Sequence, residues 1–397
     1  MRLRYGEAEE AFRAELIGWL EANVPPDEVL RQPKQSSANL QDWSRAWQRT
    51  LFDAGWLVPG WPPELGGRNA TAAQQMIYFE ELSKREIPRT LNPQGLGIVA
   101  PSVRDYGTPE QQERFLLPTL RAEIAWCIGM SEPGAGSDLA SLSTRAVLDG
   151  DHFVVNGQKV WTSGAHHSDW CVCFVRTDPD VPKHKGISAL IIDMTTPGVE
   201  CRPFPELSEP DYFDFNEVFF TDVVVPRENL LGDLHQGWPI TQGSLAHERA
   251  MLWIDYAYLA QRAVNAMIAM GDRPGPDGRP LRESERFRDD VASYYIDAQA
   301  LFLMGYRGFA KFMKGKSSPE HSLLKLYGSE TLQRILDTGA DALGPEGIDT
   351  SVLGPVMWRD GAWAVQWMRS FSGTIPGGTS EIQRNIIAER VLGLPRR

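Results

Sequence analysis

The spacing of hydrophobic positions changes twice along the 397 residues of the chain. Up to about residue 122 the apolar residues recur at helical spacing, and the segment YGTPEQQERFLLPTLRAE contains a clear helix start. Thr108 can cap this helix, Pro109 suits its first position, and Gln111 completes a capping box. Short β-branched and aromatic runs such as GISALIIDM then take over, and they give way to long apolar helical segments after about residue 235.

This order of elements predicts an α+β chain in which a β domain separates two helical regions. Because the length exceeds what one core usually supports, we expect an N-terminal helical domain over 1–122, a middle β domain over 123–235 and a C-terminal helical bundle over 236–397. Within the middle domain, the pair Asn156-Gly157 predicts a tight hairpin turn. Further on, the Pro- and Gly-rich segment GDRPGPDGRPLRESER predicts a break between two helices.

The net charge and the distribution of apolar residues narrow the classes of partner. The formal charge is -12, whereas nonspecific nucleic-acid binding depends on clustered Lys and Arg, so we expect no nucleic-acid partner. The N-terminal stretch lacks the apolar core and cleavage site of a signal peptide, and no apolar run approaches the length of a membrane span. These features predict a cytoplasmic protein without a membrane partner.

The cysteines and histidines do not form a recognisable metal motif. Cys127, Cys171, Cys173 and Cys201 make neither a CxxC pair nor a metal-ligand array, and no HExxH motif is present. We therefore expect reduced thiols and no metal site.

Two neighbouring segments of the middle region carry candidate chemistry. GMSEPGAGSDLASL, residues 129–142, is rich in Gly and Ser, but Leu139 stands where a dinucleotide fingerprint needs its third Gly, and strands follow. Such a loop is either an ordinary turn or a source of free backbone N–H groups for an anionic or heterocyclic ligand. About 20 residues later, Trp161 beside Thr162 and Ser163 offers a stacking surface with hydrogen-bond donors, although core packing is the alternative for the Trp.

Taken together, the motifs resemble those of acyl-CoA dehydrogenases. MSEPGAGSD, NGQKVWTSGA, FNEVFFTDVVVP and GGTSEIQRNIIAERVLGLP occur in the order and spacing typical of that family, and the resemblance covers nearly the whole chain. It implies an FAD flavoprotein with a helical N-terminal domain, a β-barrel-like middle domain and a C-terminal four-helix bundle. The implied reaction, part of fatty acid and lipid metabolism, converts an acyl-CoA to the trans-2-enoyl-CoA, and an electron-transfer flavoprotein is the implied electron acceptor.

The resemblance also assigns site residues by position. Ile128, Met130 and Ser131 would contact the isoalloxazine ring, Ser137 would lie near the pyrophosphate, and Trp161 with Ser163 would cover the reactive N5 edge. The expected cofactor contacts are Ile128, Met130, Ser131, Gly136, Ser137, Trp161, Ser163, Thr379 and Glu381. The expected substrate contacts are Ser137, Arg249, Gly377 and Gly378.

The acid of the final motif is missing. Many family members carry the catalytic glutamate where this chain has Gly377, yet removal of an α-proton needs a positioned base with a raised pKa. Glu248 is the candidate, because its helical neighbours Leu245, Met251 and Leu252 form an apolar stripe. The alternative is a structural Glu and Arg pair with other charges. One branch of the family, acting on branched, long or steroid-side-chain acyl groups, carries its base on this helix before an Arg, and HERAML resembles that branch.

Two elements that reach a neighbouring subunit's FAD in many family members are altered here, in the segments DRPGPDGRPL and GADALGPEG. The chain is therefore expected to form either a homo-oligomer, dimer or tetramer, with changed FAD contacts, or one half of an α2β2 assembly. Two further alternatives remain. The same fold hosts oxidases and monooxygenases that act on substrates without CoA, and a noncatalytic binding subunit would reduce no flavin.

Overall fold

The computed structural model describes residues 5–312, 320–351, 353–354 and 361–395, with the side chains of 244–253, 312, 321, 322, 353, 354 and 361 excepted. The chain divides into two compact units. The first contains residues 1–75 and 88–248, and the second contains 76–87 and 249–397. The predicted N-terminal helices and the predicted β region thus fall largely into one unit, while the boundaries proposed at 122 and 235 remain a prediction.

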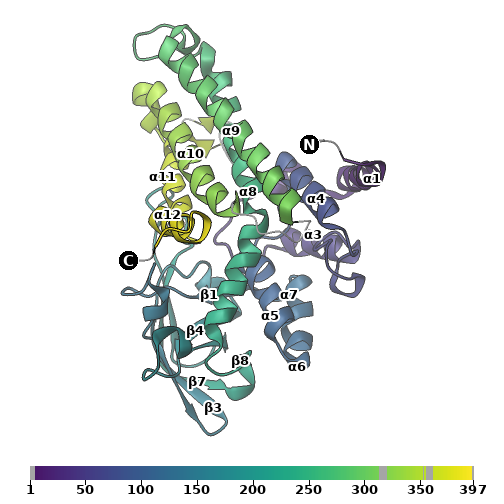
Figure 1. Ribbon diagram of the computed structural model, residues 1–397, viewed down its shortest axis with the longest axis vertical. Helices are drawn as coiled ribbons and strands as arrows, with labels where there is room; N and C mark the ends of the chain where they lie inside the picture. Colours follow the sequence, from purple (N-terminus) through teal and green to yellow (C-terminus); the bar gives the residue numbers. More distant parts are fainter. Residues whose placement is uncertain (1–4, 313–319, 352, 355–360, 396–397) are drawn as a thin grey trace. The chain divides into compact units, whose positions relative to one another are not determined.

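The first unit combines short helices with one sheet (Figure 1). Its helices are α1 (Glu7–Asn23), α2 (Asp27–Leu30), α3 (Asp42–Asp53), α5 (Ala100–Tyr106), α6 (Pro109–Gln111) and α7 (Leu117–Leu120), with π-helical turns at Gly95–Val99 and Gln112–Leu116. The predicted capping box is confirmed, since the Thr108 hydroxyl accepts from the Gln111 amide and the Gln111 side chain accepts from the Thr108 amide.

The sheet has eight strands in the order β6-β7-β3-β2-β4-β5-β8, with β1 paired in parallel to β4. The strands are β1 (Trp126–Gly129), β2 (Arg145–Asp149), β3 (His152–Lys159), β4 (Trp170–Arg176), β5 (Ile187–Asp193), β6 (Val199–Pro203), β7 (Asn216–Pro226) and β8 (Leu230–Leu231). Apart from β1 with β4 and the single contact of β2 with β4, the neighbouring strands run antiparallel. Inward-facing residues such as Phe153, Val155, Cys171, Cys173 and Val218 form its buried core.

The predicted hairpin turn at Asn156-Gly157 is wrong. Both residues lie inside β3, and the β2–β3 hairpin closes at Gly150–Asp151 instead. A β-bulge accounts for the pair: the Asn156 side chain exchanges hydrogen bonds with Asp222 at 3.0 and 2.9 Å, and the register shifts there. Gly157, at φ +150°, leaves room for Thr144, whose Cα would lie 2.6 Å from a Cβ at that position.

Strand β1 is fixed at its start by the helical part of the first unit. The Asn92 side chain donates to the Trp126 carbonyl at 2.8 Å and accepts from the Trp126 amide at 2.9 Å. The fully buried Trp126 ring donates to the Thr119 hydroxyl at 2.7 Å and meets Phe115 edge-on. These contacts fix the start of β1, the strand that leads into the glycine-rich segment.

The second unit is helical. Its elements are α9 (Glu285–Phe312), α10 (Glu320–Ala342), α11 (Trp363–Gly373), α12 (Ser380–Ile386) and the two-stranded pair β9 (Leu353–Gly354) and β10 (Gly361–Ala362). Two helices run from the first unit into the second, α4 (Ala72–Arg85) and α8 (Gly237–Ala269). The predicted break is confirmed, because α8 ends at Ala269 and α9 begins at Glu285.

The α+β class, with a helical N-terminal region, a sheet in the middle and C-terminal helices, agrees with the prediction. None of the helices in the described part of the chain has the length and apolar character needed to span a bilayer.

Candidate active site

The glycine-rich segment leaves the sheet directly after β1, at Gly129. A Cβ on Gly129 would lie 3.1 Å from the Cys173 sulfur and 3.2 Å from Cγ of Lys159. The absence of a side chain at Gly129 therefore lets the Lys159 side chain pack against the end of β1. The lysine, on the last position of β3, is fully buried.

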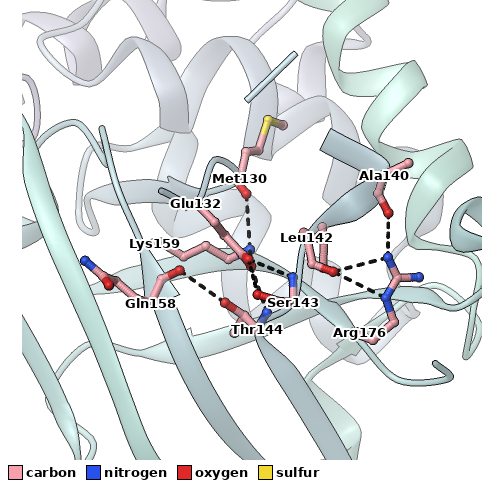
Figure 2. Close-up of polar contacts among 9 residues, drawn as sticks. All are labelled: Met130, Glu132, Ala140, Leu142, Ser143, Thr144, Gln158, Lys159 and Arg176. Atoms are coloured by element: carbon pink, nitrogen blue, oxygen red, sulfur yellow. Dashed lines mark hydrogen bonds and ion pairs between the residues drawn. The ribbon is translucent and has the colours of Figure 1, made fainter. Parts of the chain in front are cut away.

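Lys159 and Glu132 form a buried ion pair at the start of the segment. The Lys159 ammonium donates to the Glu132 carboxylate at 2.8 Å and to the Met130 carbonyl at 3.1 Å. The other hydrogen bonds to the carboxylate come from the Ser143 amide and hydroxyl and the Thr144 amide, at 2.7, 2.8 and 2.8 Å. Figure 2 shows the lysine and glutamate side chains converging with the Met130 carbonyl. A buried carboxylate is tolerated when it is this fully hydrogen-bonded.

Burial alone would raise the pKa of Glu132. The opposite charge of Lys159 and the hydrogen bonds from Lys159, Thr144 and Ser143 outweigh that effect and lower the pKa to about 2. Glu132 is therefore ionised at neutral pH, so it serves as a fixed anion and cannot act as a base near pH 7.

This lowered pKa predicts an acid-dependent contribution to stability. At pH values above 4.5, the ordinary pKa of a glutamate, the ionised Glu132 stabilises the folded protein. This contribution is lost as the pH falls toward about 2, the pKa of Glu132 in the folded state. We expect the difference in unfolding free energy between wild type and Glu132→Gln to stay constant from neutral pH down to about pH 5 and to narrow below it. Urea unfolding along a pH series measures this. The control is Glu200→Gln, which changes one member of an exposed ion pair. A difference in unfolding free energy between wild type and Glu132→Gln that did not vary with pH would contradict the lowered pKa of Glu132.

The far end of the segment is held by a second cation. Arg176, at the end of β4, donates to the Ala140 carbonyl at 2.5 Å and to the Leu142 carbonyl at 3.3 and 3.2 Å (Figure 2). Lys183 pairs with Asp138 at 2.6 Å on the surface. The loop between residues 130 and 142 is thus held at both ends, and its middle faces outward.

Several donors along this loop have no hydrogen-bond partner among the described residues. The amides of Ser131, Gly136 and Ser137 and the hydroxyls of Ser131 and Ser137 make no hydrogen bond to any other residue that the structure describes. Gly136 and Ser137 are exposed, and Ser131 is half-buried. A row of free donors on a braced loop suits a ligand rich in acceptor atoms.

Trp161 lies two residues beyond β3 in an unusual conformation. Its φ of 61° is rare for a bulky residue, and its side chain is 59% exposed. The rings of Phe204 and Phe215 meet it edge-on, with centroids at 5.3 and 5.6 Å. Core packing is therefore not its role, and a strained, exposed aromatic residue braced by two others is typical of a ligand site.

The turn that carries Trp161 also packs against an N-terminal loop. A Cβ on Gly164 would lie 2.6 Å from the Ala38 Cβ, the Ser36 hydroxyl lies 2.9 Å from Nδ1 of His167, and the Ser37 amide donates to Asp214 at 2.6 Å. Burial lowers the pKa of His167, which keeps this contact uncharged near neutral pH.

Thr162 and Ser163 differ in their surroundings on the same turn. The Thr162 hydroxyl is buried without a hydrogen-bond partner in the described part of the chain. Ser163 is half-buried, and its hydroxyl likewise makes no hydrogen bond to a described residue.

In the second unit, the sequence GGTSE forms a tight turn before α12. Gly377 and Gly378 have φ values of 66° and 101°, and the Thr379 hydroxyl caps α12 by accepting from the Ile382 amide at 3.2 Å. The buried Lys325 donates to the Gly378 carbonyl at 2.7 Å. Glu381 is exposed. Among the residues that the structure describes, no atom outside the neighbouring residues lies within 4 Å of a Cβ built on Gly377.

The predicted base falls outside what the structure describes. Glu248 and Arg249 lie in α8, but their side chains are among those excepted above. The other predicted residues fall into two groups. The first unit carries Ile128, Met130, Ser131, Gly136, Ser137, Trp161 and Ser163, and the second carries Gly377, Gly378, Thr379 and Glu381.

The motifs do not reveal the residues that hold the first group in place, namely Glu132, Lys159 and Arg176. One signal was available: a lysine on a strand rich in apolar residues, in HFVVNGQKVW, is often buried and then needs a partner. No group of three or more His, Cys, Asp or Glu residues placed to hold a metal ion occurs within the described ranges.

Comparison with known proteins bears on this arrangement. The chain matches the acyl-CoA dehydrogenase N-terminal domain over residues 6–123, the middle domain over 127–223 and the C-terminal domain over 235–392. Acyl-CoA dehydrogenase IpdE1 of Mycobacterium tuberculosis is 34% identical over 395 residues, 98% of each chain. The solved structure of the Tcur3481-Tcur3483 steroid ACAD covers both chains fully with 31% identity and a TM-score of 0.82.

The ChsE4-ChsE5 complex from Mycobacterium tuberculosis matches equally well, with 31% identity, full coverage of both chains and a TM-score of 0.82. The three domain matches follow one another in the family's order and together span residues 6 to 392. The order and span of these domain matches agree with the motifs, with the helix–sheet–helix architecture and with the similarity to solved structures. The chain belongs to the acyl-CoA dehydrogenase family of oxidoreductases.

Proposed function

We propose that this protein is an FAD-dependent dehydrogenase that converts a bulky acyl-CoA, of the size of a steroid side-chain thioester, into its trans-2-enoyl-CoA. One observation carries the proposal. The free donors of the 130–137 loop and the exposed, strained Trp161 lie on the two segments that leave β1 and β3, and the Lys159–Glu132 pair joins these segments.

The residues of the first unit fit FAD. The amide and hydroxyl of Ser131 and the hydroxyl of Ser163 suit the polar edge of the isoalloxazine ring, and Trp161 offers a stacking surface. The amides of Gly136 and Ser137 suit the pyrophosphate. FAD, when bound, would accept the hydride that leaves the β-carbon of the substrate. The further contacts Ile128, Met130, Thr379 and Glu381 are proposed with them.

The chain must also supply a base for the α-proton. Gly377 carries no ionisable group, and Glu132 is held as an ion by Lys159, so neither can take a proton near neutral pH. We assign this step to Glu248 on α8, with Arg249, Ser137, Gly377 and Gly378 proposed along the substrate. The base removes the α-proton as the β-carbon loses its hydride, which leaves a trans double bond beside the thioester carbonyl.

Two observations favour a bulky acyl group. A solved relative with 31% identity is named as a steroid ACAD, and no atom of the described residues outside the chain neighbours lies within 4 Å of a Cβ built on Gly377. A turn without side chains in this position leaves space that a glutamate would fill. The acyl class is therefore part of the proposal.

The proposed function predicts the outcome of an anaerobic titration. Purified alone and titrated with straight, branched and steroid-type acyl-CoAs, the protein should show a visible flavin band that steroid-type thioesters bleach promptly and short straight ones bleach slowly. Abundant flavin that no thioester bleaches, combined with fast reaction toward O2, would favour an oxidase or monooxygenase instead. Flavin that is present but bleached best by short straight chains would refute the assigned acyl class.

A second candidate is that the chain is one subunit of an α2β2 dehydrogenase. It is favoured by two solved relatives whose names give two components, Tcur3481-Tcur3483 and ChsE4-ChsE5. A chain of this type would purify with little flavin and regain it when co-expressed with its partner. A homo-oligomer with full FAD occupancy would contradict this assembly. Electron-transfer flavoprotein is the proposed acceptor in either case.

A further inference from the structure

Lys159 occupies a place where a lysine is seldom found. Its side chain is fully buried at the end of β3, and no proposed step of the reaction uses it. Removing an ammonium group from water is costly unless charge and hydrogen bonds compensate. Glu132 supplies the compensating charge at 2.8 Å, and its side chain is only 5% exposed.

One of the two ammonium contacts is to backbone. The Lys159 ammonium donates to the Met130 carbonyl at 3.1 Å, and the next carbonyl, that of Ser131, accepts from the Val160 amide at 2.9 Å. Both carbonyls of this pair of residues therefore face the end of β3. Apolar side chains at position 159 could not provide the first of these bonds.

The geometry of the peptide bond carries this effect to the other side of the chain. The Met130 carbonyl and the Ser131 amide belong to one planar trans peptide group, so they point in opposite directions. When Lys159 holds the carbonyl, the Ser131 N–H is directed away from the ion pair. That N–H has no acceptor among the residues the structure describes.

We infer that Lys159, held by Glu132, is a positioning residue that orients the Ser131 peptide for the flavin ring. The pair itself contacts no cofactor atom and acts through the backbone of Met130 and Ser131. The inference rests on the proposed FAD site. It goes beyond that site by making flavin affinity depend on an ion pair buried behind the loop.

The test compares Lys159→Met with Arg202→Met. Arg202 forms an exposed ion pair with Glu200 on the same sheet, with both side chains more than half exposed at 56% and 58%. Apoprotein of each variant is titrated with FAD, and the dissociation constant is obtained from the quenching of flavin fluorescence. The absorption band of the bound flavin and the far-UV circular dichroism are recorded on the same samples.

We expect Lys159→Met to weaken FAD binding about tenfold or more and to shift the flavin band, with an unchanged circular dichroism spectrum. Arg202→Met should bind FAD as the wild type does. A purely structural role for the pair would lower the thermal midpoint of Lys159→Met but leave the dissociation constant and the band of its folded fraction unchanged. That result would overturn the inference.

Removing one partner of a buried pair leaves the other charge uncompensated, so Lys159→Met could unfold. If it does, the double variant Lys159→Met/Glu132→Met is tested in place of Lys159→Met, because apolar side chains often substitute for a buried ion pair without loss of stability. Weakened FAD binding in the folded double variant supports the inference, and wild-type binding refutes it. If neither variant folds, the pair determines the fold and the positioning role is withdrawn.

The same series separates this inference from the proposed function. Wild-type protein that binds FAD and is bleached by an acyl-CoA upholds the function whatever Lys159→Met does. Wild-type protein that binds no FAD, even with a partner subunit present, overturns both.

Discussion

Replacing Glu248 by glutamine is expected to lower kcat by a factor of about 10²–10⁴ while FAD stays bound. Glutamine keeps the size of the side chain but cannot accept the α-proton, and hydride loss from the β-carbon is unfavourable without that step. The rate is measured with the best acyl-CoA from the titration and an artificial electron acceptor, and flavin content is read from the visible spectrum.

Glu285→Gln is the matched control for this variant. Glu285 is an exposed glutamate in the first turn of α9, so its replacement should leave kcat unchanged. A Glu248→Gln enzyme with near-normal turnover would remove Glu248 from the mechanism. The structural alternative, in which Glu248 only pairs with other charges, predicts a lower thermal midpoint with kcat of the folded enzyme preserved.

Gly164→Ala is expected to destabilise the first unit by up to about 5 kcal/mol. Gly164 has φ of 69°, where an L-residue is strained by about 1–2 kcal/mol. Its new Cβ would also lie 2.6 Å from the Ala38 Cβ and 2.8 Å from the Ala38 amide nitrogen, and overpacking of this kind costs about 1–3 kcal/mol. The clash involves backbone, so a side-chain rotation cannot relieve it.

Gly150→Ala isolates the contribution of the clash. Gly150, in the β2–β3 turn, has a similar φ of 61°, but a Cβ there would meet nothing within 4 Å. Urea unfolding of both variants should therefore give a clearly larger loss for Gly164→Ala. FAD binding should also weaken in that variant alone, because Gly164 belongs to the turn that presents Trp161 and Ser163. Equal losses of unfolding free energy in the two variants would show that the loop around Ala38 moves aside without an energetic cost.

The pair Asn156-Gly157 shows how a local sequence preference for a hairpin turn can fail to predict the structure. Asn-Gly pairs favour two-residue hairpin turns, yet Asn156-Gly157 forms a bulge inside β3. The cause lies in distant residues, because Asn156 pairs with Asp222, and Gly157 allows Thr144 to approach. That approach matters to the site, since the Thr144 amide is one of the donors to Glu132.

The candidate site shows the same limit. The motifs single out residues that we propose to contact the flavin, such as Ser131 and Trp161, because serine, glycine and aromatic residues are recognisable as residue types. They do not reveal that Trp161 is strained and braced by Phe204 and Phe215, the first and last residues of the segment that joins β6 to β7. Nor do they reveal that the Trp161 turn rests on residues 36–38 of the N-terminal region.

Local physical chemistry along the chain accounts for the features that the sequence predicts correctly. Helical and strand periodicity gave the order of the elements, the capping box at Thr108 gave a helix start, and the Pro- and Gly-rich break after α8 gave a helix end. The motifs, read together, indicated the family. Each of these features depends on residues that are close together along the chain.

The distant residues that support the site become visible once the chain is folded. Lys159 meets Glu132 across 27 positions, and Ser36 meets His167 across 131. Burial makes the contact between Lys159 and Glu132 necessary for stability. An ammonium and a carboxylate that are removed from water destabilise the fold unless they contact each other. The sequence contains both charges, but it does not show that the strand and the loop that carry them are packed together.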